Sequence, residues 1–363
     1  MKKLCYPQNQ YWDQNYCFGR TVINNAVTLL LALTLFAFLA TQASATVFSF
    51  TTGNPDGKIA TLARVPSVAG IQTETADDFI LDTNTLITHA TFTGLIPAGV
   101  SLSSITEVEI EFYHVFPVDS VNPPSTNVPT RVNSPADVEI ASATRDSADG
   151  SLSFTVTLLN SSFTASNSVV NGINASPAQF TGGEGPVTGQ EVLVSVTFNP
   201  PVALPGDHYF FRPEALLDSG NFLWLSAPKP TAPPIFVGDL QSWIRNDKLA
   251  PDWLRIGTDI THQGPFNASF SLLGETDVDA DGVPDSQDQC PNTPPGSIVN
   301  AEGCSIDQLV PCDGPWKNHG QFVSTLAHVT QDFVRDGLIS ESQRNDIISS
   351  GAQSNCGKGK KGR

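Results

Sequence analysis

Residues 107–116 read Glu-Val-Glu-Ile-Glu-Phe-Tyr-His-Val-Phe, a nearly perfect alternation of polar and apolar side chains. A period of two places the apolar residues on one face of an extended strand and the polar residues on the other. The run 191–198 repeats this pattern. Further strand-like runs lie at 47–51, 76–81, 86–94, 151–159, 208–212, 221–226 and 267–273. We therefore expect strands that bury one face and keep the other in water.

The whole segment 46–275 lacks a convincing helical pattern, and Pro and Gly separate its strand-like runs. Many short strands with turn signals between them predict a mainly β fold, an antiparallel β-sandwich of the jelly-roll type. The stretches 117–137 and 161–189 exceed the length of ordinary hairpin turns. Long loops on a rigid sandwich either carry binding residues or are tolerated insertions, and the sequence leaves both open.

Residues 277–288 read Asp-Val-Asp-Ala-Asp-Gly-Val-Pro-Asp-Ser-Gln-Asp, with carboxylates at positions 1, 3, 5, 9 and 12 and glycine at position 6. This spacing is typical of a calcium loop. No Lys or Arg occurs between Arg255 and Lys317 to neutralise these acids, and no cysteine or histidine cluster favours zinc or copper. The alternative is a solvated acidic linker. We predict Ca²⁺ ligands at Asp277, Asp279, Asp281, Val283 (through its carbonyl), Asp285 and Asp288.

The flanks of this loop exclude an EF-hand, because 266–273 alternates like a strand and three prolines follow within 291–295. We expect no helix close to the loop. Residues 277–304 resemble a bacterial thrombospondin type 3 repeat, with the pattern DxDxDGxxDxxDxCPxTPxG followed by a second cysteine. Beyond the aspartates, the matching residues are Gly282, Cys290, Pro291, Thr293, Pro294, Gly296, Gly303 and Cys304. The resemblance implies calcium binding through the aspartates in an extracellular protein. Asn300 and Ala301 depart from the pattern, so a second calcium site is not implied.

Residues 1–45 have the composition of a secretion signal, with Lys2, Lys3 and Arg20 before an apolar stretch at 26–40 and Ala-Ser-Ala at 43–45. We expect cleavage before Thr46, with a retained membrane anchor as the alternative, and no transmembrane span in the mature chain.

Cys5 and Cys17 leave with this signal, and the four remaining cysteines allow three pairings. We favour Cys290 with Cys304, which closes the repeat, and Cys312 with Cys356, which clamps a helical hairpin. Disulfides of this kind indicate an oxidising, extracytoplasmic compartment.

The chain carries 19 basic and 36 acidic residues, a formal net charge of −17 that repels nucleic acid. Its C-terminal part changes to helical spacing at Phe322, Leu326, Val329 and Phe333. Gly337 ends this predicted helix, and a second one starts with a capping box at 340–343 and carries Ile347, Ile348 and Ala352. The basic tail could touch anionic lipid or polysaccharide, or remain solvated. The predicted organisation is 1–45 signal peptide, 46–275 β-sandwich, 276–311 calcium repeat, 312–356 helical hairpin and 357–363 basic tail.

The sandwich also resembles uncharacterised secreted domains of bacterial envelope proteins. The similar residues are Ala-Asp-Asp-Phe at 76–79, Thr-Phe-Thr-Gly at 91–94 and Pro-Gly-Asp-His-Tyr-Phe at 205–210. Some proteins with such domains end in a PEP-CTERM sorting signal, whereas no C-terminal hydrophobic helix is found in this sequence. The resemblance therefore implies neither that sorting route nor an activity.

Motifs for known catalytic sites are absent from the sequence, and we expect no catalytic residue and no cofactor other than Ca²⁺. The function we predict is a secreted or cell-surface, non-catalytic calcium-binding protein that makes adhesive or matrix contacts with polysaccharide or a cell-surface protein, with calcium as a structural brace. One alternative is a carbohydrate-binding module that uses Trp224, Trp243 and Trp253, although burial of these residues in a core is the simpler interpretation. The other alternative is a sandwich-fold glycoside hydrolase, for which Glu184 and Glu214 are isolated candidates for the catalytic carboxylates. Glu107, Glu109 and Glu111 share one face of a strand, and we expect them to be solvated.

Overall fold

The computed structural model describes residues 47–67, 70–118, 128–146, 149–173, 181–228 and 241–358. The predicted signal peptide at 1–45, including Cys5 and Cys17, lies outside the described residues. So do residues 359–363 of the basic tail and parts of the two long loops. None of the helices in the described part of the chain is both long and apolar enough to span a bilayer.

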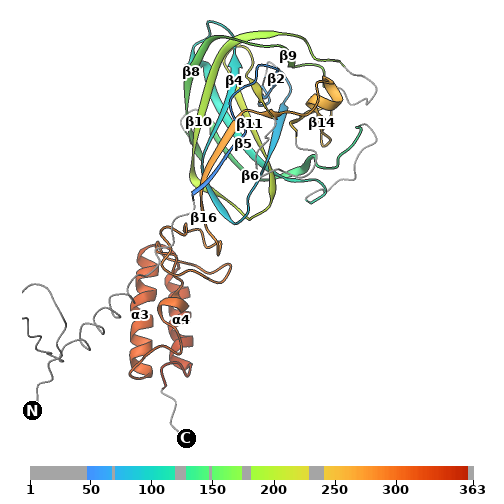
Figure 1. Cartoon of the computed structure of the whole chain (residues 1–363). Coiled ribbons are helices and arrows are strands. Elements are labelled where there is room, and N and C mark those ends of the chain that lie inside the picture. Colours follow the sequence, from blue (N-terminus) through green and yellow to red (C-terminus); the bar gives the residue numbers. More distant parts are fainter. Residues whose placement is uncertain are drawn as a thin grey trace, which may run out of the picture. The chain divides into compact units, whose positions relative to one another are not determined.

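The described chain is mainly β and forms two sheets (Figure 1). The nine-stranded sheet contains β1 (Val47–Thr51), β2 (Ile59–Leu62), β4 (Thr85–Ile96), β8 (Leu152–Ala165), β9 (Asn167–Val169), β10 (Val187–Leu204), β12 (Leu223–Ala227), β15 (Asn267–Ala268) and β16 (Phe270–Thr276). The seven-stranded sheet contains β3 (Thr73–Ile80), β5 (Ile105–Val115), β6 (Pro135–Asp146), β7 (Asp149–Gly150), β11 (His208–Leu217), β13 (Trp243–Asn246) and β14 (Leu254–Arg255).

The strand order confirms the predicted jelly roll. One sheet contains the order β1-β16-β4-β10 and the other the order β3-β11-β5-β6, all of them antiparallel neighbours. The chain therefore passes repeatedly from one sheet to the other, and its first strand pairs with its last. One pair departs from the antiparallel prediction, because β2 and β9 run parallel.

The core between the sheets follows from the alternation in the sequence. Val108, Ile110 and Phe112 of β5 are fully buried, and the apolar residues of β10 meet them from the other sheet. Aromatic rings fill the centre, where Phe211 and Phe270 stack with their centroids 5.1 Å apart. Burial of this many large side chains is the main source of stability for such a sandwich.

A second core lies beside the first and had no clear signal in the sequence. It joins β2, β9, β13 and β14 to a π-helix at Ile256–Ile260. Elsewhere in the sandwich, a 3₁₀ helix at Leu102–Ser104 precedes β5. The stretch 161–189 is also less of a loop than predicted, since β8 continues to Ala165 and β9 follows at once. Strand β2 is buried along its whole length, so its sequence does not alternate.

The C-terminal part contains three helices, α2 (Ile306–Leu309), α3 (His319–Arg335) and α4 (Glu341–Gln353). The predicted hairpin of α3 and α4 is confirmed, together with the capping box of Ser340 and Gln343 and the positive φ of 75° at Gly337. As predicted, no helix flanks the acidic loop at 277–288 in the described residues, because β16 precedes it and the next helix, α2, starts only at Ile306. Ser305 and Gln308 form a capping box that starts α2 directly after the repeat.

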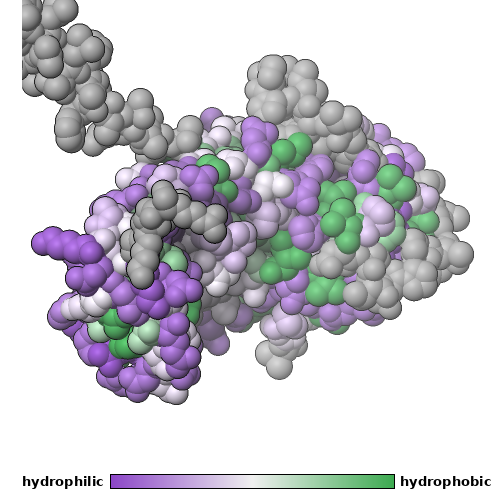
Figure 2. Space-filling view, turned by 90° about the horizontal axis from the view of Figure 1, so that it is seen from below, coloured by the Kyte–Doolittle hydropathy of each residue, from purple (hydrophilic) through white to green (hydrophobic). Residues whose placement is uncertain are grey.

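Both predicted disulfides are present. Cys290 pairs with Cys304, and Cys312 pairs with Cys356, which joins the chain just before α3 to the chain just after α4. On the face drawn in Figure 2, hydrophobic residues form small separate patches within a largely hydrophilic surface. Apart from such patches, the described apolar side chains are mostly in the cores.

Candidate calcium site

The acidic loop begins where β16 leaves the sheet. The backbone N–H of Asp277 donates to the carbonyl of Asn84 at 3.0 Å, and the Asn84 side chain donates to the carbonyl of Val278 at 3.0 Å. The N–H of Asp285 donates to the carbonyl of Thr276 at 2.8 Å, which brings the loop back to its start. The first half of the loop is therefore fixed to the end of the sandwich by backbone and amide contacts.

The aspartates fold the loop by accepting hydrogen bonds from its own backbone. Asp277 accepts from the N–H of Asp281 at 3.2 Å and of Gly282 at 3.0 Å, and Asp281 accepts through Oδ1 from the N–H of Val283 at 2.8 Å. Gly282 has a φ of 92°, in the region that glycine enters without steric cost. This explains the glycine at the sixth position of the loop.

These turns bring three predicted ligands together. Oxygen atoms of Asp277, Asp279 and Asp281 all lie within 4.8 Å of one another. Oδ2 of Asp281 is buried and has no hydrogen-bond partner, although a buried carboxylate oxygen without a partner is costly. Within the described residues, no Lys, Arg or His forms an ion pair with any of the loop aspartates. The cluster therefore has negative charge and an unused oxygen, which suit a hard divalent cation.

The other three predicted ligands are placed differently. Both oxygens of Asp285 accept hydrogen bonds, one from the Thr276 hydroxyl and one from the N–H of Val278 at 2.9 Å. Asp288 accepts from the N–H of Cys290 at 2.7 Å, and its second oxygen has no contact of this kind. The N–H of Val283 donates to Asp281, and its carbonyl accepts no hydrogen bond from the described residues. The compact group thus consists of Asp277, Asp279 and Asp281, with Asp288 adjacent.

Mutual repulsion acts on these carboxylates. Burial raises the pKa of Asp277, and the neighbouring Asp281 and Asp279 raise it further against the effect of the two backbone hydrogen bonds. The pKa of Asp288 is raised for the same reasons, by burial and then by Asp279, Asp281 and Asp285. A bound cation would remove this repulsion, since it favours the ionised form of every carboxylate that it contacts.

The second half of the repeat encloses the cluster. The N–H of Thr293 donates to Asp279 at 2.6 Å, and the Thr293 hydroxyl donates to the carbonyl of Gly303 at 2.9 Å. A Cβ on Gly303 would lie 2.2 Å from Oδ1 of Asp288 and 3.1 Å from Oδ2 of Asp281. Asn300, where the repeat pattern usually has aspartate, accepts from the N–H of Cys304 at 2.9 Å and serves to shape this turn.

No protein-family model matches the chain, and no curated protein matches it.

The tryptophans considered for sugar binding are all buried. Trp224 lies in the sandwich core and donates from Nε1 to the carbonyl of Ser269 at 2.9 Å. Trp243 and Trp253 pack with Tyr113 and Phe210 in a separate cluster, and all three tryptophans are 0% exposed. The simpler interpretation, burial in a core, is therefore the one that the structure supports.

The carboxylates considered for hydrolysis also have structural surroundings. Glu184 is exposed, but it accepts hydrogen bonds from the backbone N–H groups of residues 170–172. Glu214 is fully buried and lies 2.8 Å from Nη1 of Arg212. The prediction that Glu111 is solvated was wrong, because its side chain is 12% exposed and pairs with Arg212. The reason is that Arg212 lies on the adjacent strand and shares the outer face of β5.

This buried ion cluster continues to β3 and β13. Glu74 pairs with both Arg212 and Arg245, and the Arg245 guanidinium stacks 4.3 Å from the centre of the Trp253 ring. Burial raises the pKa of Glu74, but the two arginines outweigh it and the net pKa is lowered. Burial also raises the pKa of Glu214 to about 8, against the opposing effect of Arg212. The cluster was not recognised in the sequence, since its members are far apart in the chain.

Proposed function

We propose that this protein is an exported calcium-binding protein of the cell surface or extracellular space, in which Ca²⁺ is a structural brace and the chain has no catalytic role. The observation that carries the proposal is the group of three carboxylates within 4.8 Å of one another, which includes the buried, unpartnered Oδ2 of Asp281. The two disulfides and the predicted signal peptide support an oxidising compartment outside the cytoplasm.

The residues present fit calcium better than the alternatives. All candidate ligand atoms are oxygens, and the cysteines nearest to the cluster are held in a disulfide, which leaves no thiolate for zinc or copper. Ca²⁺ accepts irregular sets of carboxylate and carbonyl oxygens, whereas Mg²⁺ requires a stricter octahedron. Asp277, Asp279 and Asp281 would hold the ion, and Asp288 is the nearest further carboxylate.

As a brace, the ion would join the two halves of the repeat. Asp277 belongs to the half that is bonded to the sandwich through Asn84, whereas Asp279 contacts Thr293 in the half that is closed by the disulfide. Charge neutralisation would let both halves pack without repulsion. The adhesive or matrix contact remains part of the proposal, with polysaccharide or a cell-surface protein as the partner.

Calorimetric titration of the mature protein with Ca²⁺ tests the metal assignment. We expect a dissociation constant of about 0.1 to 1 mM, as in other extracellular calcium modules. The double variant Asp279→Asn with Asp281→Asn should lose the binding heat, because the amides keep the size and the backbone contacts but remove two charges. Glu302→Gln is the matched control, since Glu302 is an exposed acid of the same repeat. Equal heats for the double variant and the native protein would refute the calcium site.

A further inference from the structure

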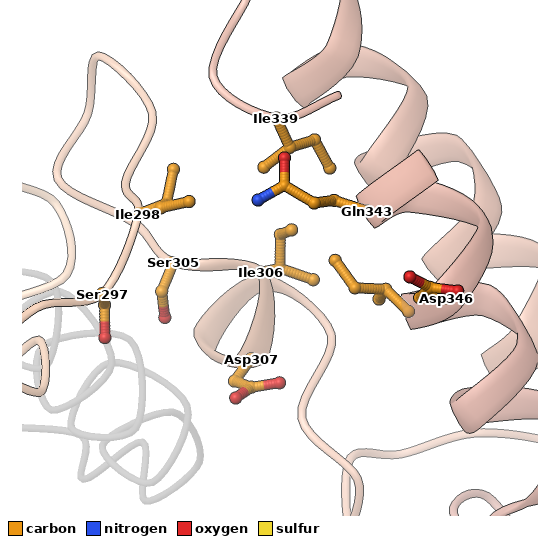
Figure 3. Close-up of a pocket in the computed structure, with 9 residues that line it drawn as sticks. Ser297, Ile298, Ser305, Ile306, Asp307, Ile339, Gln343 and Asp346 are labelled. Atoms are coloured by element: carbon orange, nitrogen blue, oxygen red, sulfur yellow. The ribbon is translucent and has the colours of Figure 1, made fainter. Parts of the chain in front are cut away.

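A groove runs along the junction between the repeat and the helical hairpin. It consists of two adjoining hollows of about 440 and 730 Å³, which share Asp307, Asp346 and Ile347 among the residues that line them. Figure 3 shows the smaller hollow, with Ser297 and Ile298 on the repeat side and Gln343 and Asp346 on α4. The sharing of these residues makes the two hollows one continuous surface feature.

The floor of the groove is aliphatic. Ile298, Ile306 and Ile339 project into the smaller hollow from the repeat, from α2 and from the chain before α4 (Figure 3). In the larger hollow the floor continues with Phe322 and Leu326 of α3. Ile298 is 44% exposed, which is unusual for an isoleucine beside other apolar side chains. Capping boxes start α2 and α4, and these helices contribute Ile306 and Ile347 to the lining of the groove.

The rim of the groove is acidic. Asp307, Asp313 and Asp346 line it, and no Lys, Arg or His is among the lining residues of either hollow. Within the described residues, none of these three aspartates takes part in an ion pair. An apolar floor with unpaired carboxylates above it is complementary to a ligand with aliphatic side chains on one face and cations beside them.

We propose that this groove binds a cationic amphipathic helix of a partner protein. Its aliphatic side chains, at positions i, i+3, i+4 and i+7, would occupy the isoleucine floor, and its Lys or Arg residues would face the three aspartates. The basic tail of this chain has no aliphatic side chain to fill the floor. A second copy of the chain would bring a net charge of −17 toward acidic residues. The inference concerns a surface other than the calcium site.

Fluorescence anisotropy with a labelled synthetic helix of Leu and Lys residues, Leu on one face, tests the proposal on the mature protein. Two control peptides test whether the arrangement and the charge of the side chains matter. One is a scrambled peptide of the same composition, and the other has Glu in place of Lys. We expect the amphipathic peptide to bind at least about tenfold more tightly than either control, which corresponds to about 1.4 kcal/mol.

Two protein variants locate the binding. Ile298→Ser removes one exposed floor residue without a change of charge, and Asp307→Lys with Asp346→Lys reverses the rim; both should weaken binding about tenfold. The matched control is Asp149→Lys with Asp218→Lys, which changes the net charge equally on exposed residues of the sandwich and should have a much smaller effect. Unchanged calcium titration and circular dichroism check that each variant is folded.

Four results would overturn the proposal. The first is equal binding of the amphipathic and scrambled peptides, and the second is equal weakening by the rim and sandwich charge reversals. The third is a concentration-dependent dimer in sedimentation that Ile298→Ser abolishes, which would make a second copy the occupant. Deletion of residues 358–363 should leave the preference for the amphipathic over the scrambled peptide unchanged. The fourth result is a preference that appears only after this deletion, which would make the tail the occupant.

Discussion

At the scale of single residues, Glu214 is a carboxyl group enclosed on the outer face of the seven-stranded sheet. Its burial outweighs the attraction of Arg212 and raises its pKa to about 8. The unfolded chain releases this proton at the ordinary value of 4.5, so the two states differ in protonation between these pH values. The native state then binds more protons, and the free energy of unfolding falls as the pH rises from 4.5 to 8.

Glu214→Gln should remove this pH dependence. The amide resembles the protonated acid and never ionises, so the variant should gain stability over the native protein as the pH rises from 5 to 8. The difference should change by up to about 1.4 kcal/mol per pH unit. Urea unfolding at several pH values measures it, with Glu302→Gln as an exposed control. Parallel stability curves for the native and Glu214→Gln proteins would contradict the assigned protonation state.

Gly303 is a position at which only glycine fits the backbone and its surroundings. Its φ is 76°, and a Cβ there would collide with Asp288 and crowd Asp281. Gly303→Ala should therefore lower calcium affinity at least about tenfold, because it displaces carboxylates of the cluster. Gly296→Ala is a close control, since Gly296 has a φ of 79° but nothing within 4 Å of an added Cβ. Each change costs about 1 to 2 kcal/mol of backbone strain, so the difference in affinity between the variants isolates the crowding.

At the scale of elements, the two disulfides serve different parts of the C-terminal region. Cys312 and Cys356 are 44 residues apart and clamp the ends of the hairpin, and their loop closure contributes about 4 kcal/mol by the chain-entropy estimate. Cys290 and Cys304 are 14 residues apart and close the segment that follows the acidic loop, and this closure contributes about 3 kcal/mol.

Removal of each disulfide should therefore have a different measurable effect. The double variant Cys312→Ser with Cys356→Ser should increase hydrogen exchange in α3 and α4 and leave calcium binding nearly intact. The double variant Cys290→Ser with Cys304→Ser should weaken calcium binding and leave the sandwich strands protected from hydrogen exchange. Hydrogen exchange by mass spectrometry and calcium titration measure the two effects. If both pairs reduced calcium affinity equally, the hairpin and the repeat would form one cooperative unit.

The elements also show what could be predicted from the sequence. Strand β5 was predictable because one of its faces packs in the core, and alternation records that difference. Strand β2 was missed because both of its faces are buried. Strand β6 was missed because it begins at a proline and has few large apolar residues. The clustering of the loop aspartates was predictable because these residues lie close together in the chain. The pairing of Glu74 with Arg212 and Arg245 was not, since it depends on three strands that only the fold brings together.

At the scale of the whole molecule, the acidic loop at 277–288 is the sole chain connection between the sandwich and the C-terminal region. Both disulfides lie after the loop, so neither bridges it. A single cut between Asp277 and Gln289 would thus separate the chain into two pieces even without reduction. The local hydrogen bonds through Asn84 and Asp285 hold this segment, but repulsion between its carboxylates acts against them.

Calcium should therefore control cleavage of the loop. Elastase cuts after small aliphatic residues, and Val278 and Ala280 supply such sites, with Val278 61% exposed. In excess EGTA we expect rapid cleavage into two fragments on a non-reducing gel, and in millimolar Ca²⁺ we expect slow cleavage, because the ion holds the loop closed. The Asp279→Asn, Asp281→Asn variant should be cut at one rate in both conditions, and Glu302→Gln should behave like the native protein. If the native protein were cut equally fast with and without calcium, the ion would not brace the connection, even where titration shows that it binds.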